Sequence, residues 1–223
     1  KCFDLVRKSL GKETLGFEML ESGKDYCVIK NVLEGSKEFD KVLRQTFILL
    51  LSMAEEGFNL MKQGNIGLLQ NLLPLEEANN RFTTFCRRYL NIKGAEDFDK
   101  IGPIYYIVEI LERIADQYKY LYQFLTNSKK ENIVVNKELL AIFNEVNVML
   151  RNFYNVFYKF DPKLVSEIKE DRDRIIKNLH NISSKINKTE EIVMYQHMMT
   201  LTAYILSMVG PYLILTIKNN NPV

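Results

Sequence analysis

One long apolar stripe constrains the fold of this 223-residue chain more than any other feature. It runs from Ile104 to Leu125, and its apolar side chains recur every three or four residues. This spacing is that of an amphipathic helix with one face in a core. Similar patterns recur on both sides of it, with only five prolines and ten glycines to interrupt them. We therefore expect an all-α fold of long helices.

The helical patterns after residue 35 fall into two similar groups. Asn65 and Asp161 open the second pattern of each group, and Tyr120 and Tyr212 stand near the end of the third. The two offsets agree within one helical turn, which indicates an internal repeat. Pro74 predicts a kink within the second helix, because proline lacks the N–H that a helix interior needs. We expect two tandem three-helix bundles, residues 36–127 and a divergent repeat 136–218.

Residues 1–35 have a different pattern. Residues 3–10 are typical of a short helix, and apolar residues then alternate along 15–19 with the period of a strand. The turn-forming sequence 22–25 leads into a β-prone run at 26–29. We expect a short helix and a β-hairpin. Because two strands are not stable alone, this segment should pair with the helical body, a further domain or a partner.

Three carboxylates lie close together on the helix that carries the long stripe. Glu109, Glu112 and Asp116 fall in one narrow sector at the edge of the stripe, given about 100° of rotation per residue. Like charges at this spacing repel. Either nearby arginines or a bound cation would relieve that repulsion, so this helix is the first place to look for function.

Composition and missing motifs exclude several classes of function. Thirty Lys and Arg nearly balance 28 Asp and Glu, so the net charge of +2 gives no general attraction to nucleic acid. Three cysteines at unrelated spacings indicate reduced thiols of a cytoplasmic protein. The sequence has no P-loop and no common hydrolase or zinc motif, and neither His180 nor His197 follows a glutamate at di-iron spacing. We therefore expect that this chain is not an enzyme.

The sixth helical pattern contains a charge-free run. Residues 198–217 are long enough to span a bilayer, although hydroxyl groups, Gly210 and Pro211 dilute their apolar character. A fully buried helix is the favoured interpretation, and a membrane tether is the alternative. Tyr118, Tyr120 and Tyr122 cannot all face the core, so at least one ring lies off it. Together with the charge-free helix, they favour a partner surface such as a homodimer interface.

Two segments carry a resemblance to a known family. Two tandem bundles with an acidic third helix resemble the PhoU family of phosphate-uptake regulators, through residues 75–81 (LEEANNR) and 111–116 (LERIAD). The second segment is similar to the Glu-x-x-x-Asp signature with which that family holds metal ions. Residues 15–33 resemble archaeal members, in which a small AbrB-type DNA-binding domain precedes the PhoU-like region. Such a domain would lie upstream of Lys1.

The resemblance implies a metal site in the first repeat. Its ligands would be Glu112 and Asp116, with Glu109, Glu76 and a supporting Asn80. Oxygen ligands suit ions such as Mg²⁺, Mn²⁺, Ca²⁺ or Fe³⁺. Alternatively, Arg81 or Arg113 neutralises these carboxylates in ordinary surface pairs. Tyr204 and Met208 stand at the equivalent positions of the second repeat, so no metal site is expected there.

The resemblance also implies a function. It points to a non-enzymatic, homodimeric regulator of phosphate uptake and phosphate signalling that docks onto a phosphate transporter or a sensor protein. One alternative is a metal-free dimerisation or effector domain of a transcription regulator, in which any DNA contact belongs to the upstream domain. The other is a membrane-tethered helical protein.

Overall fold

The computed structural model describes residues 2–23, 26–33, 35–94, 98–128 and 135–216. Helices account for 82% of these residues, and the remainder includes one antiparallel hairpin, so the mostly helical fold and the N-terminal hairpin are confirmed. In chain order the elements are α1 (Cys2–Glu13), β1 (Phe17–Ser22), β2 (Cys27–Asn31), α2 (Ser36–Lys62), the 3₁₀ helix η1 (Ile66–Leu72), α3 (Leu73–Lys93), α4 (Phe98–Asn127), α5 (Lys137–Tyr158), α6 (Pro162–Ile182), α7 (Thr189–Ser207) and α8 (Val209–Thr216).

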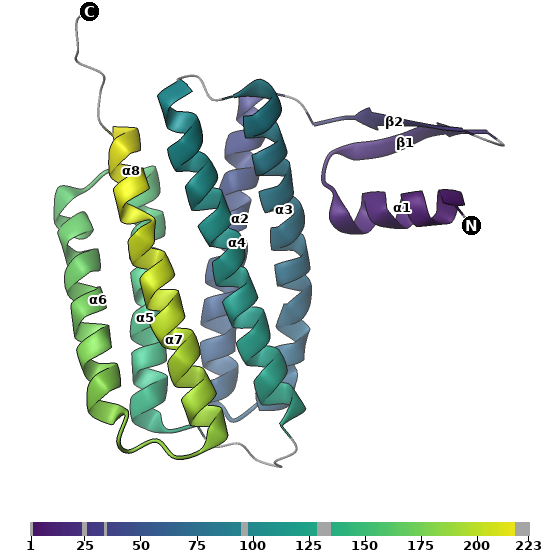
Figure 1. The fold of residues 1–223 in the computed structure, drawn as a ribbon. Helices are drawn as coiled ribbons and strands as arrows, with labels where there is room; N and C mark the ends of the chain where they lie inside the picture. Colours follow the sequence, from purple (N-terminus) through teal and green to yellow (C-terminus); the bar gives the residue numbers. More distant parts are fainter. Residues whose placement is uncertain (1, 24–25, 34, 95–97, 129–134, 217–223) are drawn as a thin grey trace, which may run out of the picture.

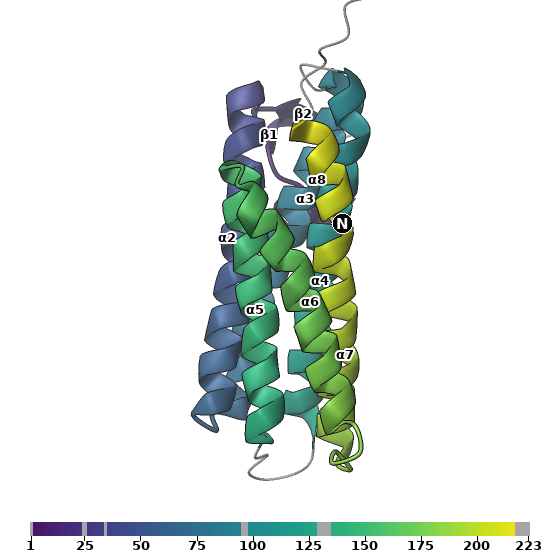
Figure 2. The same ribbon diagram turned by 90° about the vertical axis from the view of Figure 1, so that its left-hand side faces the viewer.

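Helices α2 to α7 run roughly along one common axis (Figures 1 and 2). Helices α2, α3 and α4 pack against one another, and α5, α6 and α7 do the same. The two sets meet where α2 contacts α5 and where α4 contacts α7 and α8. The division of the chain into two repeats stays a prediction. The contacts show that each set of three helices packs together and that the two sets contact each other.

A buried polar chain joins the two sets of helices. The hydroxyl of Tyr118 on α4 donates to Asn147 Oδ1 on α5 over 2.8 Å, and Asn147 Nδ2 donates to the Ala54 carbonyl on α2 over 2.9 Å. Buried polar groups need such partners, because an unpaired one keeps its full cost of desolvation. The ring of Tyr122 is also buried, whereas that of Tyr120 is half exposed. The prediction that one of the three tyrosines lies off the core is confirmed.

Pro74 begins a helix instead of kinking one. The predicted second helix divides into the 3₁₀ helix η1 and α3, and Pro74 stands in the first turn of α3. The prediction of a kink was wrong for a physical reason. The first N–H groups of a helix have no partner inside it, so proline loses nothing there, and its fixed φ suits the start of a helix.

The charge-free run is also interrupted, and it is not fully buried. The helix turns at Met208 from α7 into α8, and Pro211 lies in the first turn of α8. One face packs inward through Met194, Met198, Leu201, Ile205 and Tyr212, whereas Leu213 and Ile214 are exposed, so full burial was wrong. Within the described residues, one stretch, Thr189–Thr216, has the length and apolar composition that could cross a membrane.

The hairpin and α1 stand beside the bundle, next to α3 (Figure 1). Strands β1 and β2 pair antiparallel, with Phe17 opposite Asn31 and a bulge between Met19 and Glu21. Arg88 of α3 holds this segment, because its guanidinium donates to the Leu15 carbonyl over 2.8 Å and lies 4.1 Å from the centre of the Phe17 ring. Of the partners expected for the hairpin, the helical body therefore supplies one.

Candidate functional site

The four predicted metal ligands lie along the contact between α3 and α4. We call this the α3–α4 seam, and it consists of Glu76, Asn80, Thr83 and Arg87 on α3 and Glu109, Glu112, Asp116 and Lys119 on α4. On each helix these residues recur every three or four positions, which places them on one face. Figure 1 shows the two helices side by side along their length. The predicted grouping of these side chains results from two matched helical faces.

Arg87 neutralises Glu109 and Glu112, at one end of the seam. Its Nη1 atom lies 2.6 Å from Glu109 Oε1 and 2.5 Å from Glu112 Oε2. The Thr83 hydroxyl donates to the same Glu112 oxygen over 3.2 Å. Partial burial of Arg87 lowers its pKa, but the hydrogen bond to Glu109 and the charges of both glutamates outweigh that effect and raise the pKa. Arg87 is therefore a permanent cation between two carboxylates.

Lys119 neutralises Glu76 and Asp116, at the other end of the seam. Its Nζ atom lies 2.8 Å from Glu76 Oε1 and 2.5 Å from Asp116 Oδ1. Asn80 Nδ2 donates to Glu76 Oε1 over 2.5 Å, and the Glu76 residue is only 4% exposed. Burial lowers the pKa of Lys119, but hydrogen bonds to Asp116 and Glu76 more than compensate and raise it. The ammonium group stays charged throughout the physiological range.

Sequence reasoning identified the carboxylates but missed Arg87 and Lys119. Lys119 follows Asp116 by three residues, a spacing that puts both on one helix face, so a signal for this pair was present. Arg87 gives no such signal, because it meets Glu109 and Glu112 only through the packing of α3 on α4. The supporting residue Asn80 lies in the seam as predicted, and Arg113 is exposed on α4.

The seam holds its carboxylates in pairs, each pair with its own cation. Across the part of the chain that the structure describes, no three acidic, histidine or cysteine side chains are grouped closely enough to hold a metal ion. A cation entering the seam would have to displace Arg87 or Lys119. The metal assignment of Glu76, Glu109, Glu112 and Asp116 therefore stays a prediction that has to be tested against these internal ion pairs.

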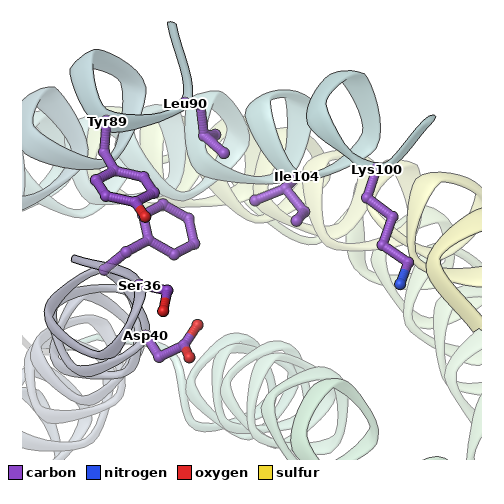
Figure 3. Close-up of a pocket in the computed structure, with 7 residues that line it drawn as sticks. Ser36, Asp40, Tyr89, Leu90, Lys100 and Ile104 are labelled. Carbon is purple, nitrogen blue, oxygen red and sulfur yellow. The ribbon is translucent and has the colours of Figure 1, made fainter. Parts of the chain in front are cut away.

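A small hollow lies where α2 begins beside the end of α3 and the start of α4. Asp40 and Lys100 point toward it from opposite walls, and Tyr89 and Ile104 form part of its lining (Figure 3). Its volume is about 210 Å³, which is below the roughly 300–1,000 Å³ of typical small-molecule sites. The hollow therefore does not compete with the seam as a candidate site.

The chain matches no family model, no curated protein and no solved structure. The resemblance to the PhoU family consequently depends on the residues quoted for it, and on how the fold arranges them.

Proposed function

We propose that this chain is a non-enzymatic, cytoplasmic regulator of phosphate uptake that acts by docking onto other proteins. One observation carries the proposal. The two segments that resemble the PhoU family, 75–81 and 111–116, meet across the α3–α4 seam, where Lys119 bridges Glu76 of the first segment and Asp116 of the second. Residues far apart in the sequence thus act as one structural unit, as the resemblance implies.

The finer architecture belongs to the same proposal. Residues 36–127 and 136–218 form two tandem three-helix bundles, supported by the mutual packing within α2, α3 and α4 and within α5, α6 and α7. In the second bundle, Asp171 pairs with Arg174 over 2.6 Å and accepts a hydrogen bond from Asn152. This second half serves as a structural unit, and the first half carries the acidic seam.

The ion pairs and hydrogen bonds of the acidic and histidine side chains favour docking over catalysis. In the seam, the carboxylates are engaged by Arg87 and Lys119, which leaves them poorly placed to accept a proton from a substrate. His197 hydrogen-bonds Gln117 over 2.8 Å and links α7 to α4, and burial lowers its pKa. These are contacts of a folded scaffold.

Deletion of the gene in its natural host tests this function. In phosphate-rich medium we expect cells without the protein to continue phosphate uptake that the parent strain represses, because the inhibitory docking partner is absent. The measurement is the initial rate of radiolabelled phosphate uptake, together with the transcript level of the phosphate transporter. Expression of the intact gene should restore repression. Unchanged uptake and transporter expression after deletion would contradict the proposal.

Metal binding by the seam is a second candidate, favoured by its four carboxylates against two cations. If the seam can hold an ion, Arg87→Gln should bind Mn²⁺ about tenfold more tightly than the wild type, because one internal competitor is removed. Isothermal titration with Mn²⁺, Mg²⁺ and Fe³⁺ provides the comparison, and Glu112→Ala/Asp116→Ala should abolish the signal.

Arg151→Gln is the matched control for this titration, because it breaks an exposed pair with Glu55 outside the seam. If the wild type, Arg87→Gln and Arg151→Gln all give no heat of binding, or if Glu112→Ala/Asp116→Ala gives the same titration as the wild type, the metal-free alternative is correct. The chain would then act as a dimerisation or effector domain without a bound ion.

A further inference from the structure

The hairpin is incompletely paired. Within the described residues, β1 and β2 form a two-stranded sheet, a size that is at best marginally stable by itself. Helix α1 contacts β1 and α3, and Arg88 holds Leu15 and Phe17 at the base of the hairpin. These contacts fix the position of the segment, but no other strand among the described residues pairs with the outer edge of β1 or of β2.

The surface around β2 is unusually apolar for an exposed element. Side chains that are between 41% and 57% exposed are Leu20, Tyr26, Val28, Ile29 and Val32. Exposed apolar groups that cluster on one small element indicate an interaction surface. Because open strand edges pair readily with other strands, the apolar hairpin is suited to receive a further strand.

The edge of β1 is badly suited to this role. The bulge between Met19 and Glu21 interrupts the regular spacing of its backbone groups, and bulges are a common means of blocking an edge. Strand β1 also carries Glu18 and Glu21, whose negative charges would approach one another if two copies paired through this strand. Strand β2 has no bulge and a single charged residue, Lys30.

The hydrogen bonds of the hairpin determine which backbone groups of β2 point outward. The Val32 N–H donates to the Gly16 carbonyl over 2.7 Å, and the Gly23 N–H donates to the Tyr26 carbonyl over 2.8 Å. Bonded and non-bonded pairs alternate along an antiparallel ladder. The pairs at the two ends of the ladder, Gly16 with Val32 and Gly23 with Tyr26, are hydrogen-bonded. Counting inward from these pairs, with the bulge included, places Cys27, Ile29 and Asn31 in non-hydrogen-bonded pairs. Their N–H and C=O groups therefore point away from β1.

We propose that β2 pairs antiparallel with β2 of a second copy of this chain, with the two-fold axis at Ile29. The result is a continuous four-stranded sheet in the order β1, β2, β2 of the second copy and β1 of the second copy. The backbone N–H and C=O groups of Ile29 then form hydrogen bonds with those of Ile29 in the second copy. The backbone groups of Cys27 form hydrogen bonds with those of Asn31 in the second copy. Lys30 lies opposite Val28 of the second copy, so the two Lys30 side chains do not face each other and their charges do not repel at close range.

This pairing assigns the dimer contact to the hairpin instead of to the charge-free run 198–217, which the sequence favoured as a partner surface. It goes beyond the proposed phosphate function and does not depend on it. A failure of the pairing would leave phosphate regulation untouched, and unchanged phosphate uptake in the deletion strain would leave the pairing untouched.

Disulfide formation between differently tagged copies tests the register. In a Cys2→Ser/Cys27→Ser background, Val28→Cys and Lys30→Cys are placed on separate, co-expressed chains. These positions face each other in a non-bonded pair, where strands approach most closely. Mild oxidation should give a disulfide between the two tags in most of the mixed dimers. Each variant alone should give no such product, and neither should Glu18→Cys with Lys30→Cys, because these residues pair within one hairpin.

The oligomeric state provides a second, independent readout. Light scattering should give the mass of two chains for the wild type and of one chain for Ile29→Pro, because proline removes an outward N–H without breaking the bonds to β1. A monomeric wild type, a dimeric Ile29→Pro or a mixed pair that does not cross-link would overturn the proposal. Dimers that persist without cross-links would place the contact outside the β2 edge.

Discussion

Replacement of Lys119 by methionine should reduce the free energy of unfolding by about 3 kcal/mol at neutral pH. Lys119 bridges Glu76 and Asp116 across the α3–α4 seam, and Glu76 is 4% exposed. Methionine preserves most of the apolar stem but leaves a buried carboxylate without its cation, which costs far more than the loss of a surface pair. Urea unfolding followed by circular dichroism measures the change.

Lys41→Met is the matched control for this experiment. Lys41 pairs with Glu38 at the same 2.8 Å distance, but the lysine side chain is 69% exposed, and such surface pairs contribute about 0.5 kcal/mol or less. The double variant Glu76→Gln/Lys119→Met should recover much of the loss, because a neutral amide is buried at a lower cost. Equal losses for Lys119→Met and Lys41→Met would contradict the account of the seam as a buried ion-pair network.

The same ion pairs show which part of the site was predictable. The carboxylates could be placed together because helical periodicity alone puts Glu109, Glu112 and Asp116 on one face. Their partner Arg87 could not be identified, because it comes from another helix, and its position depends on how α3 is shifted along α4. A search along the sequence finds contacts between neighbouring turns. It does not find contacts that only tertiary packing creates.

The fold was predictable to a similar extent. Long apolar stripes and few breaks were sufficient for the mostly helical class and for the N-terminal hairpin. The errors concern prolines and burial. Pro74 and Pro211 both stand in the first turn of a helix, a position that sequence patterns alone do not distinguish from a kink. The run from Met198 to Thr216 lacks charges on its exposed side as well as its buried side, so its pattern overstated its burial.

The close approach of α2 to α4 leads to the second large prediction. Gly57 of α2 lies against the ring of the fully buried Tyr122 of α4, whose hydroxyl donates to the Met53 carbonyl over 2.8 Å. A Cβ atom at position 57 would overlap with the Tyr122 hydroxyl oxygen and with the ring carbon Cζ. We therefore expect Gly57→Ala to lower the free energy of unfolding by about 2–3 kcal/mol, the cost of overpacking a rigid core.

Gly67→Ala distinguishes this clash from a general effect of replacing glycine. Gly67 is exposed on the 3₁₀ helix η1, and a Cβ atom there meets nothing within 4 Å. Alanine should therefore stabilise the protein by about 0.5–1 kcal/mol, because glycine is the more flexible residue in the unfolded chain. In urea unfolding, the two substitutions should change stability in opposite directions. Tyr122→Leu should reduce the additional cost of Gly57→Ala in a double-mutant cycle, because it removes the atoms that clash. If the two costs simply add, the close packing of α2 on Tyr122 is not what requires glycine at position 57.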